Sequence, residues 1–299
     1  IARFYRDGGE AFGVLSPVFA PFSSRLAATA ARSVLLLQLR GVMRVLGMRR
    51  PLIWVACPTA AVVLERLTHS GIVHQLSDCY GALKNGEACA GAQAERAVAE
   101  QADLIICSSE RLLERARGLY GKGEYVEHGV DFEEFEAAGR SAAGPIELKG
   151  VKPPLIGFYG NLDGNTVDRN LLESVCRLRP QYSFVLVGDM SSEFESLKAI
   201  PNVVAIPSQP YQRVAQFGAS FNVCLMPWLK NEWIEHCNPV KLKEYLALGK
   251  PVVSTPFPEL QRSGSLCFQA SGPEAFAAAI DRALRDDHPT EQERRRAWA

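Results

Sequence analysis

A segment that begins at Asn238 and Pro239 combines residue types that suit an anionic ligand. The asparagine can bond a free backbone amide and the proline has no amide to satisfy, so the pair predicts a helix start. Amides from Asn238 to Val240 would favour a phosphate, and Lys241, one turn in, adds a full charge. Glu244 lies three residues on, on the same helical face, and could accept hydrogen bonds from sugar hydroxyls. The arrangement suits a nucleotide's diphosphate and ribose; the alternative is an ordinary surface pair of Lys241 and Glu244.

Gly249 is expected to end this helix, and Val252 and Val253 to form a buried parallel strand. The whole run, PVKLKEYLALGKPVV from Pro239, resembles the nucleotide-sugar signature of two-domain GT-B glycosyltransferases. It is most similar to bacterial exopolysaccharide and teichuronic-acid-type enzymes, including glucuronosyltransferases of polysaccharide synthesis. The resemblance implies that Lys241 holds the donor diphosphate and Glu244 its ribose.

Composition narrows the class of protein. A chain of 299 residues is long enough for two domains of ordinary size. Lys+Arg and Asp+Glu both number 33, which argues against nucleic acid as a partner. No apolar run reaches the roughly 18 to 20 residues of a membrane span. The eight cysteines contain no C-x-x-C pair and the five histidines are scattered, so we expect reduced thiols of a cytoplasmic protein, with no metal and no cofactor.

From residue 51 onward, strand-like and helix-like segments alternate, as in a parallel sheet covered by helices. Strands are expected at residues 52–56, 72–76, 102–109, 155–159, 183–187, 202–206, 221–228 and 252–253. Helices are expected at residues 58–67, 87–101, 110–120, 168–178 and 274–284. An Ala-, Gly- and Pro-rich stretch at 137–154 predicts the interdomain linker.

Asp78 directly follows the expected strand at residues 72–76. Ligands of open α/β sheets bind beyond the carboxyl ends of strands, and a carboxylate there could take a proton from an acceptor hydroxyl. The alternative is an aspartate that only shapes a turn or caps a helix. In the family that the chain resembles, an aspartate after the corresponding strand is the base of inverting members, so the resemblance implies Asp78 as the catalytic base.

The sequence Glu127-His128-Gly129-Val130-Asp131 resembles the family's Asn/His-Gly-Val-Asp element. That element lies at the domain cleft near the donor. The resemblance implies that His128 donates toward the substrate or its phosphate, and Gly129 permits a close backbone approach. A hydrogen-bonded structural histidine is the alternative.

The second half of the chain supplies further candidates for the nucleotide-sugar site. Gly160 and Asn161 follow an expected strand, and such a turn offers backbone amides to a phosphate. Gly188 ends the next strand. Gln209 and Tyr211 lie where relatives pack the nucleobase.

Two departures from the family pattern bear on the mechanism. The turn after Gly160 lacks the Arg and Lys of retaining relatives. His236 stands where those relatives place a glutamate eight residues before Glu244, and Glu235 is one place off. The first departure favours inversion of the sugar over retention, and the second means that the usual two-glutamate motif is not intact, which favours the alternative of an inactive homologue.

The first 50 residues carry two expectations. The chain begins without the strand, Gly-rich turn and helix of a Rossmann-like half, so a first strand is expected to be missing. Residues 23–48 have helical spacing with interspersed arginines. These arginines either face water or form a basic face for peripheral contact with the inner membrane surface.

These observations predict an α/β protein of GT-B architecture, with two Rossmann-like domains whose parallel sheets face a cleft. Residues 1–145 would bind the acceptor and residues 146–299 the nucleotide sugar. The expected reaction moves a sugar from a nucleotide-diphosphate sugar, a UDP-sugar being favoured, to a saccharide or polyprenyl-linked acceptor in cell-surface polysaccharide synthesis, with inversion and without a metal. The alternatives are a retaining transferase, an inactive nucleotide- or partner-binding homologue, and a nucleotide-sugar epimerase.

Overall fold

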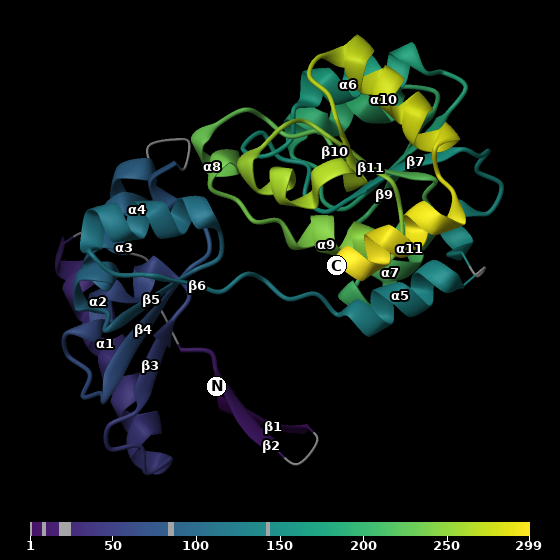
Figure 1. Cartoon of the computed structure of the whole chain (residues 1–299). Coiled ribbons are helices and arrows are strands. Elements are labelled where there is room, and N and C mark those ends of the chain that lie inside the picture. Colours follow the sequence, from purple (N-terminus) through teal and green to yellow (C-terminus); the bar gives the residue numbers. More distant parts are fainter. Residues whose placement is uncertain (1, 8–9, 18–24, 83–86, 142–143) are drawn as a thin grey trace.

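The structure is a computed structural model that describes residues 2–7, 10–17, 25–82, 87–141 and 144–299. Two α/β halves, each built on its own parallel sheet, are joined at a narrow junction (Figure 1). The predicted fold class is therefore confirmed at the level of its sheets.

The C-terminal half contains a six-stranded parallel sheet in the order β12-β11-β10-β7-β8-β9. Its strands are apolar on both faces, because helices cover the sheet from both sides. The strands are β7 Leu155–Tyr159, β8 Ser183–Val187, β9 Val203–Ile206, β10 Val223–Met226, β11 Val252–Ser254 and β12 Cys267–Gln269. The helical segments are α6 Arg169–Leu178, η4 Ser192–Ala199, α7 Tyr211–Ser220, α8 Glu232–Glu235, α9 Val240–Ala247, η5 Pro258–Leu266, α10 Pro273–Arg285 and α11 Pro289–Trp298.

The N-terminal half contains a four-stranded parallel sheet in the order β3-β4-β5-β6. The strands are β3 Leu52–Val55, β4 Gly71–Leu76, β5 Leu104–Cys107 and β6 Glu124–Tyr125. The helical segments are α1 Arg25–Val45, η1 Pro58–Ala60, α2 Ala61–Leu64, η2 Tyr80–Ala82, α3 Glu87–Gln101 and α4 Glu110–Tyr120. Before them, β1 Ala2–Asp7 and β2 Glu10–Leu15 form an antiparallel hairpin, which the sequence analysis does not predict.

The predicted linker at residues 137–154 is wrong in its position. The chain leaves the N-terminal half through an extended segment at 126–131 and then forms α5 Phe132–Arg140. This helix packs against α7 and α9 of the C-terminal half through the fully buried Phe135. The Ala- and Gly-rich composition suggested a loop, but Phe135, with the partly buried Phe132 and Ala138, packs the short helix on the core of the neighbouring half.

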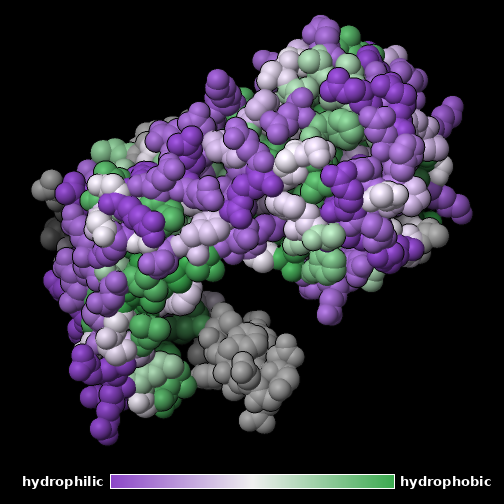
Figure 2. Space-filling model, in the orientation of Figure 1, coloured by the Kyte–Doolittle hydropathy of each residue, from purple (hydrophilic) through white to green (hydrophobic). Residues whose placement is uncertain are grey.

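Hydrophobic surface gathers on the lower part of the N-terminal half in Figure 2, where Figure 1 places β3 and α1. The side chains of Leu37, Leu52 and Trp54 are 69%, 60% and 55% exposed. Strand β3 is the edge of its sheet in the part of the chain that the structure describes. No helix among the described residues is long and apolar enough to cross a membrane.

Candidate nucleotide-sugar site

The order of strands in the C-terminal half locates a crevice. Strand β7 lies at the centre of the sheet, and the chain runs outward from it first through β8 and β9 and then through β10, β11 and β12. Ligands of open α/β sheets bind at such a switch point, beyond the carboxyl ends of the strands. Gly160 follows β7 at this edge, and the side chain of Lys241 from α9 reaches it.

Lys241 is held in an apolar setting at this edge. Its Nζ lies 4.0 Å from the centre of the Phe158 ring. A Cβ added at Gly160 would lie 2.7 Å from the same Nζ, so a side chain there would displace the end of the lysine from its present place. Burial lowers the pKa of Lys241 to about 8, although the nearby charges of Glu244 and Asp163 partly oppose the shift. An anionic ligand would offset the desolvation of this ammonium group.

Glu244, one turn after Lys241, is 6% exposed and accepts a hydrogen bond of 2.9 Å from the Tyr159 hydroxyl. The hydroxyl of Tyr211 from α7 also lies near enough to this carboxylate to lower its pKa. Burial raises the pKa of Glu244, while the tyrosine hydroxyls and the charge of Lys241 favour its ionised form. The carboxylate is thus a fixed acceptor beside the ammonium group, as the predicted ribose contact requires.

Gly188 ends β8 and packs directly on Gly160. It has a φ of 144°, and a Cβ added there would lie 2.1 Å from the Gly160 carbonyl oxygen. The ends of β7 and β8 therefore approach more closely than any residue with a side chain would allow.

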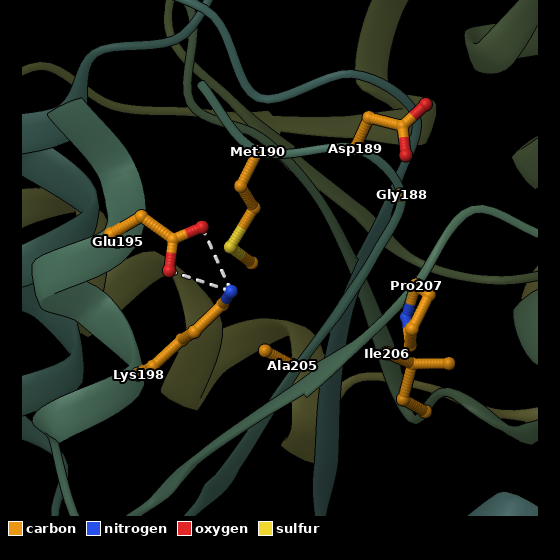
Figure 3. Close-up of a pocket in the computed structure, with 8 residues that line it drawn as sticks. All are labelled: Gly188, Asp189, Met190, Glu195, Lys198, Ala205, Ile206 and Pro207. Atoms are coloured by element: carbon orange, nitrogen blue, oxygen red, sulfur yellow. Dashed lines mark hydrogen bonds and ion pairs between the residues drawn. The ribbon is translucent and has the colours of Figure 1, made fainter. Parts of the chain in front are cut away.

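A cavity of about 280 Å³ opens at the carboxyl ends of β8 and β9 (Figure 3). The volume is close to the lower limit of small-molecule sites, roughly 300 Å³, and suits a single ring system. Figure 3 shows Met190 projecting into it, with the exposed pair Lys198 and Glu195 at 2.7 Å on one side. The lining residues are Gly188, Asp189, Met190, Glu195, Lys198, Ala205, Ile206 and Pro207.

Asp78 comes from the opposite half of the molecule. It lies just beyond the carboxyl end of β4, is half-buried, and has its pKa raised by burial. The Cys237 thiol, whose pKa burial raises to about 12, feels both the negative charge of Asp78 and the positive charge of Lys241. Both groups are therefore close enough to this thiol to act on it electrostatically.

Comparisons with known proteins agree with this geometry. Residues 153–286 match the model of the family described as "Glycosyl transferases group 1". The chain therefore contains a glycosyl transferases group 1 domain. This group 1 domain includes β7 through α10, and with them Gly160, Lys241 and Glu244.

A curated relative carries the name of a teichuronic acid biosynthesis glycosyltransferase, TuaH of Bacillus subtilis (strain 168). It is 24% identical over 226 residues, which cover 70% of this chain and 56% of the relative. The match thus spans little more than half the length of that protein.

Solved structures share the fold at low identity. Sucrose-phosphate synthase from Thermosynechococcus elongatus superposes with a TM-score of 0.74 at 17% identity, over 95% of this chain and 78% of the other. Anabaena HepE in complex with UDP-glucose superposes with a TM-score of 0.67 at 15% identity, over 93% of this chain and 85% of the other. WaaG, a glycosyltransferase involved in lipopolysaccharide biosynthesis, superposes with a TM-score of 0.67 at 15% identity, over 95% of this chain and 81% of the other. The fold around the group 1 domain is GT-B, as predicted.

Within the group 1 domain, the predicted cap at Asn238 is wrong. Helix α9 begins at Val240, after Pro239 as the N-cap, and no side chain caps it. The Asn238 side chain instead donates a hydrogen bond of 2.7 Å to the backbone oxygen of Ser108 in the other half. The Asn238 side chain is oriented toward this buried carbonyl, which needs a hydrogen-bond donor, and it does not cap the helix.

The remaining predicted residues lie around the group 1 domain in different settings. Asn161 is exposed in the loop after Gly160. The Gln209 side chain donates a hydrogen bond of 3.0 Å to the Pro207 oxygen and accepts one of 2.7 Å from Arg213. It is not among the residues that line the cavity. The backbone oxygen of His128 accepts a hydrogen bond from Lys243 of α9, and burial lowers the pKa of the His128 ring.

Sequence reasoning missed the two aromatic residues that complete the site. Phe158 and Tyr159 were read only as part of a buried strand, whereas their side chains hold Lys241 and Glu244. The available signal was positional: both lie at the carboxyl end of the first strand of the half, directly before the glycine turn.

Proposed function

We propose that the protein is a glycosyltransferase that moves a sugar from a nucleotide-diphosphate sugar to a saccharide or polyprenyl-linked acceptor in cell-surface polysaccharide synthesis. The observation that carries the proposal is the desolvated Lys241 ammonium beside Gly160, with the Glu244 carboxylate fixed one turn away. A UDP-sugar is the favoured donor, because the structurally similar HepE was solved with UDP, with UDP and glucose, and with UDP-glucose.

In this proposal the diphosphate lies between Lys241 and the free amides at the start of α9. The ribose hydroxyls bond Glu244, and the base enters the cavity that Gly188 lines. As the glycosidic bond breaks, negative charge grows on the leaving diphosphate, and the positive charge of Lys241 stabilises it. Gly160 assists this step because, without a side chain, it lets the ammonium group approach the backbone.

Asp78 acts in the proposal as the base that takes the proton of the acceptor hydroxyl, and the sugar is inverted. Its support is its place at the end of β4 and its charge, which, like that of Lys241, acts on the Cys237 thiol. His128, at the junction between the halves, donates toward the substrate. Asp78→Asn should then lower the rate of transfer by about a hundredfold or more, with little change in nucleotide affinity.

The stereochemistry of the product separates inversion from retention. NMR of the purified product should show the anomeric configuration opposite to that of the donor. Retention, together with full activity of Asp78→Asn, would assign the proton transfer to the donor phosphate and leave Asp78 a structural residue.

Binding calorimetry tests the donor site itself. UDP-, GDP- and ADP-sugars are titrated into the wild-type protein and into Lys241→Ala, with the exposed Lys152→Ala as the matched control. Loss of a charge-assisted contact should weaken donor binding about tenfold to a hundredfold in Lys241→Ala and leave Lys152→Ala unchanged. Equal affinities in all three proteins would overturn the proposal.

Two of the alternatives have their own signatures in the same samples. An inactive homologue would bind the donor without transfer or hydrolysis. An epimerase would convert a purified donor into an isomer in the absence of any acceptor. Transfer that depends on Lys241 contradicts the first, and an unchanged donor sugar contradicts the second.

The proposed location is the cytoplasm, with peripheral contact at the inner membrane surface through α1. Leu37 and Val45 of this helix are 69% and 84% exposed, and Arg40 and Arg44 lie on the same helix. Exposed apolar and cationic side chains together favour an anionic lipid surface. Co-sedimentation with vesicles that contain anionic lipid, but not with neutral ones, is the expected result.

A further inference from the structure

Three side chains of metal-binding type meet where the two halves face each other. Cys79 follows β4 in the N-terminal half, and Glu232 and His236 lie at the two ends of α8 in the C-terminal half. One potential ligand atom from each lies within 4.8 Å of the others. The Cys79 sulfur is 3.9 Å from a carboxylate oxygen of Glu232, although 153 residues separate the two in the chain.

The chemistry of the three groups matches one class of ion. Thiolate, imidazole and carboxylate are the ligands of Zn²⁺, with bond lengths of about 2.0 to 2.3 Å and tetrahedral angles. A sulfur and an oxygen on one tetrahedral zinc ion would lie about 3.6 Å apart. The observed 3.9 Å between Cys79 and Glu232 is thus within a few tenths of an ångström of what a shared ion requires.

The His236 ring is already oriented. Its Nδ1 lies 2.8 Å from the backbone oxygen of Glu232. A carbonyl oxygen only accepts, so the neutral ring has its proton on Nδ1 and its lone pair on Nε2. Metal-binding histidines show this arrangement, in which a backbone carbonyl fixes the tautomer through the nitrogen that does not bind the metal.

We propose that Cys79, Glu232 and His236 bind a zinc-type divalent cation that links the two halves of the molecule. Three protein ligands leave the fourth tetrahedral position for water. Because the ligands come from both halves, the bound ion holds the cleft in the arrangement of this structure and restrains its opening. The site uses none of the residues assigned to the donor, and its existence does not depend on glycosyl transfer.

Cobalt(II) is a suitable probe, because its visible spectrum reports tetrahedral geometry and thiolate ligation. The full chain, freed of metal with a chelator, is titrated with Co²⁺ and then with Zn²⁺. We expect one equivalent of Co²⁺ to bind with a sulfur charge-transfer band, and one equivalent of Zn²⁺ to displace it. Absence of the band, or binding without defined stoichiometry, would overturn the proposal.

Variants assign the site to its residues. Cys79→Ser should abolish the charge-transfer band, and His236→Ala should weaken the affinity for Zn²⁺ by about tenfold or more. The matched control is Cys89→Ser, which removes an exposed thiol outside the site and should leave the titration unchanged. Circular dichroism confirms that each variant is folded. A band that persists in Cys79→Ser would show that another thiol binds the metal and would refute the assignment.

Small-angle scattering tests the link between the halves. Zn²⁺ should narrow the distribution of distances in the wild-type protein but not in Cys79→Ser. Calorimetry with UDP on the same samples is independent of this result, so loss of the metal site and loss of the donor site are distinguishable. An identical response to Zn²⁺ in both proteins would contradict the bridging role.

Discussion

Lys241 is a cation kept where the charged form is disfavoured. Burial lowers its pKa to about 8, against an ordinary value of 10.5, while the carboxylates of Glu244 and Asp163 partly oppose the shift. The ammonium is therefore largely protonated below pH 8 and largely neutral above it. A diphosphate would compensate the lost hydration, so donor binding and protonation of Lys241 should be coupled.

This coupling predicts the pH dependence of UDP binding. Above pH 8 the free protein must take up a proton to bind, so the dissociation constant should rise about tenfold per pH unit. Calorimetry between pH 7 and 9.5, in buffers of different ionisation enthalpy, measures both the affinity and the proton uptake. Lys241→Ala is the control and should lose the dependence; the same slope in that variant would assign it to another group.

The stability of the unliganded protein should follow the opposite trend in the same window. Because the folded-state pKa is below the unfolded one, the unfolded chain binds more protons between about pH 8 and 10.5, and this group's contribution to stability rises with pH. Titration of Lys241 thus weakens UDP binding above pH 8 while its contribution to the free energy of unfolding rises. General alkaline unfolding would lower both the affinity for UDP and the free energy of unfolding.

At this scale, helical spacing was enough to pair Lys241 with Glu244 from the sequence. The prediction that Asn238 caps the helix was wrong because its side chain donates to the backbone oxygen of Ser108, which is 130 residues away in the sequence. The contact of Tyr159 with Glu244 spans 85 residues and has no local signature. Sequence patterns describe contacts within one element, whereas the site is made between elements.

The glycine turns after β7 and β8 set the shape of the donor edge. Gly188→Ala would place a methyl group 2.1 Å from the Gly160 carbonyl oxygen at a φ of 144°. We expect the free energy of unfolding to fall by about 3 kcal/mol or more, from backbone strain plus the clash. Urea denaturation of wild type and variant measures it.

Gly150→Ala is the matched control for this substitution. Its φ of 86° is also unfavourable for a side chain, but an added Cβ meets nothing within 4 Å. Its cost should be limited to about 1 kcal/mol of strain. If the two variants were equally stable, the close approach of the two glycine turns would be refuted.

The elements themselves were largely predictable. Buried strands such as β7 and β8, and helices such as α3 and α4, lie where periodicity and apolar runs placed them. Helix α5 was not found, because Phe135 is its one fully buried residue and its stability comes from the other half. Tertiary packing, not local propensity, decides such short helices.

The two halves are held together by contacts that connect the donor helix to the junction. Lys243 of α9 pairs with Glu127 at 2.8 Å and also bonds the His128 backbone oxygen. The hydroxyl of Ser109, the N-cap of α4, donates a hydrogen bond of 2.7 Å to the backbone oxygen of His236. The helix that carries Lys241 is thus connected directly to the half that carries Asp78.

The last prediction concerns this connection. Lys243 is 8% exposed and lies outside the donor site, so Lys243→Met should keep a buried apolar stem while removing the pairing with Glu127. We expect UDP affinity to stay within about threefold, because it depends on the C-terminal half, whereas the rate of transfer falls about tenfold as Asp78 loses its alignment. Kinetics with calorimetry, and Lys152→Met as the exposed control, measure the two effects. An unchanged rate of transfer would mean that other contacts alone fix the relative positions of the halves.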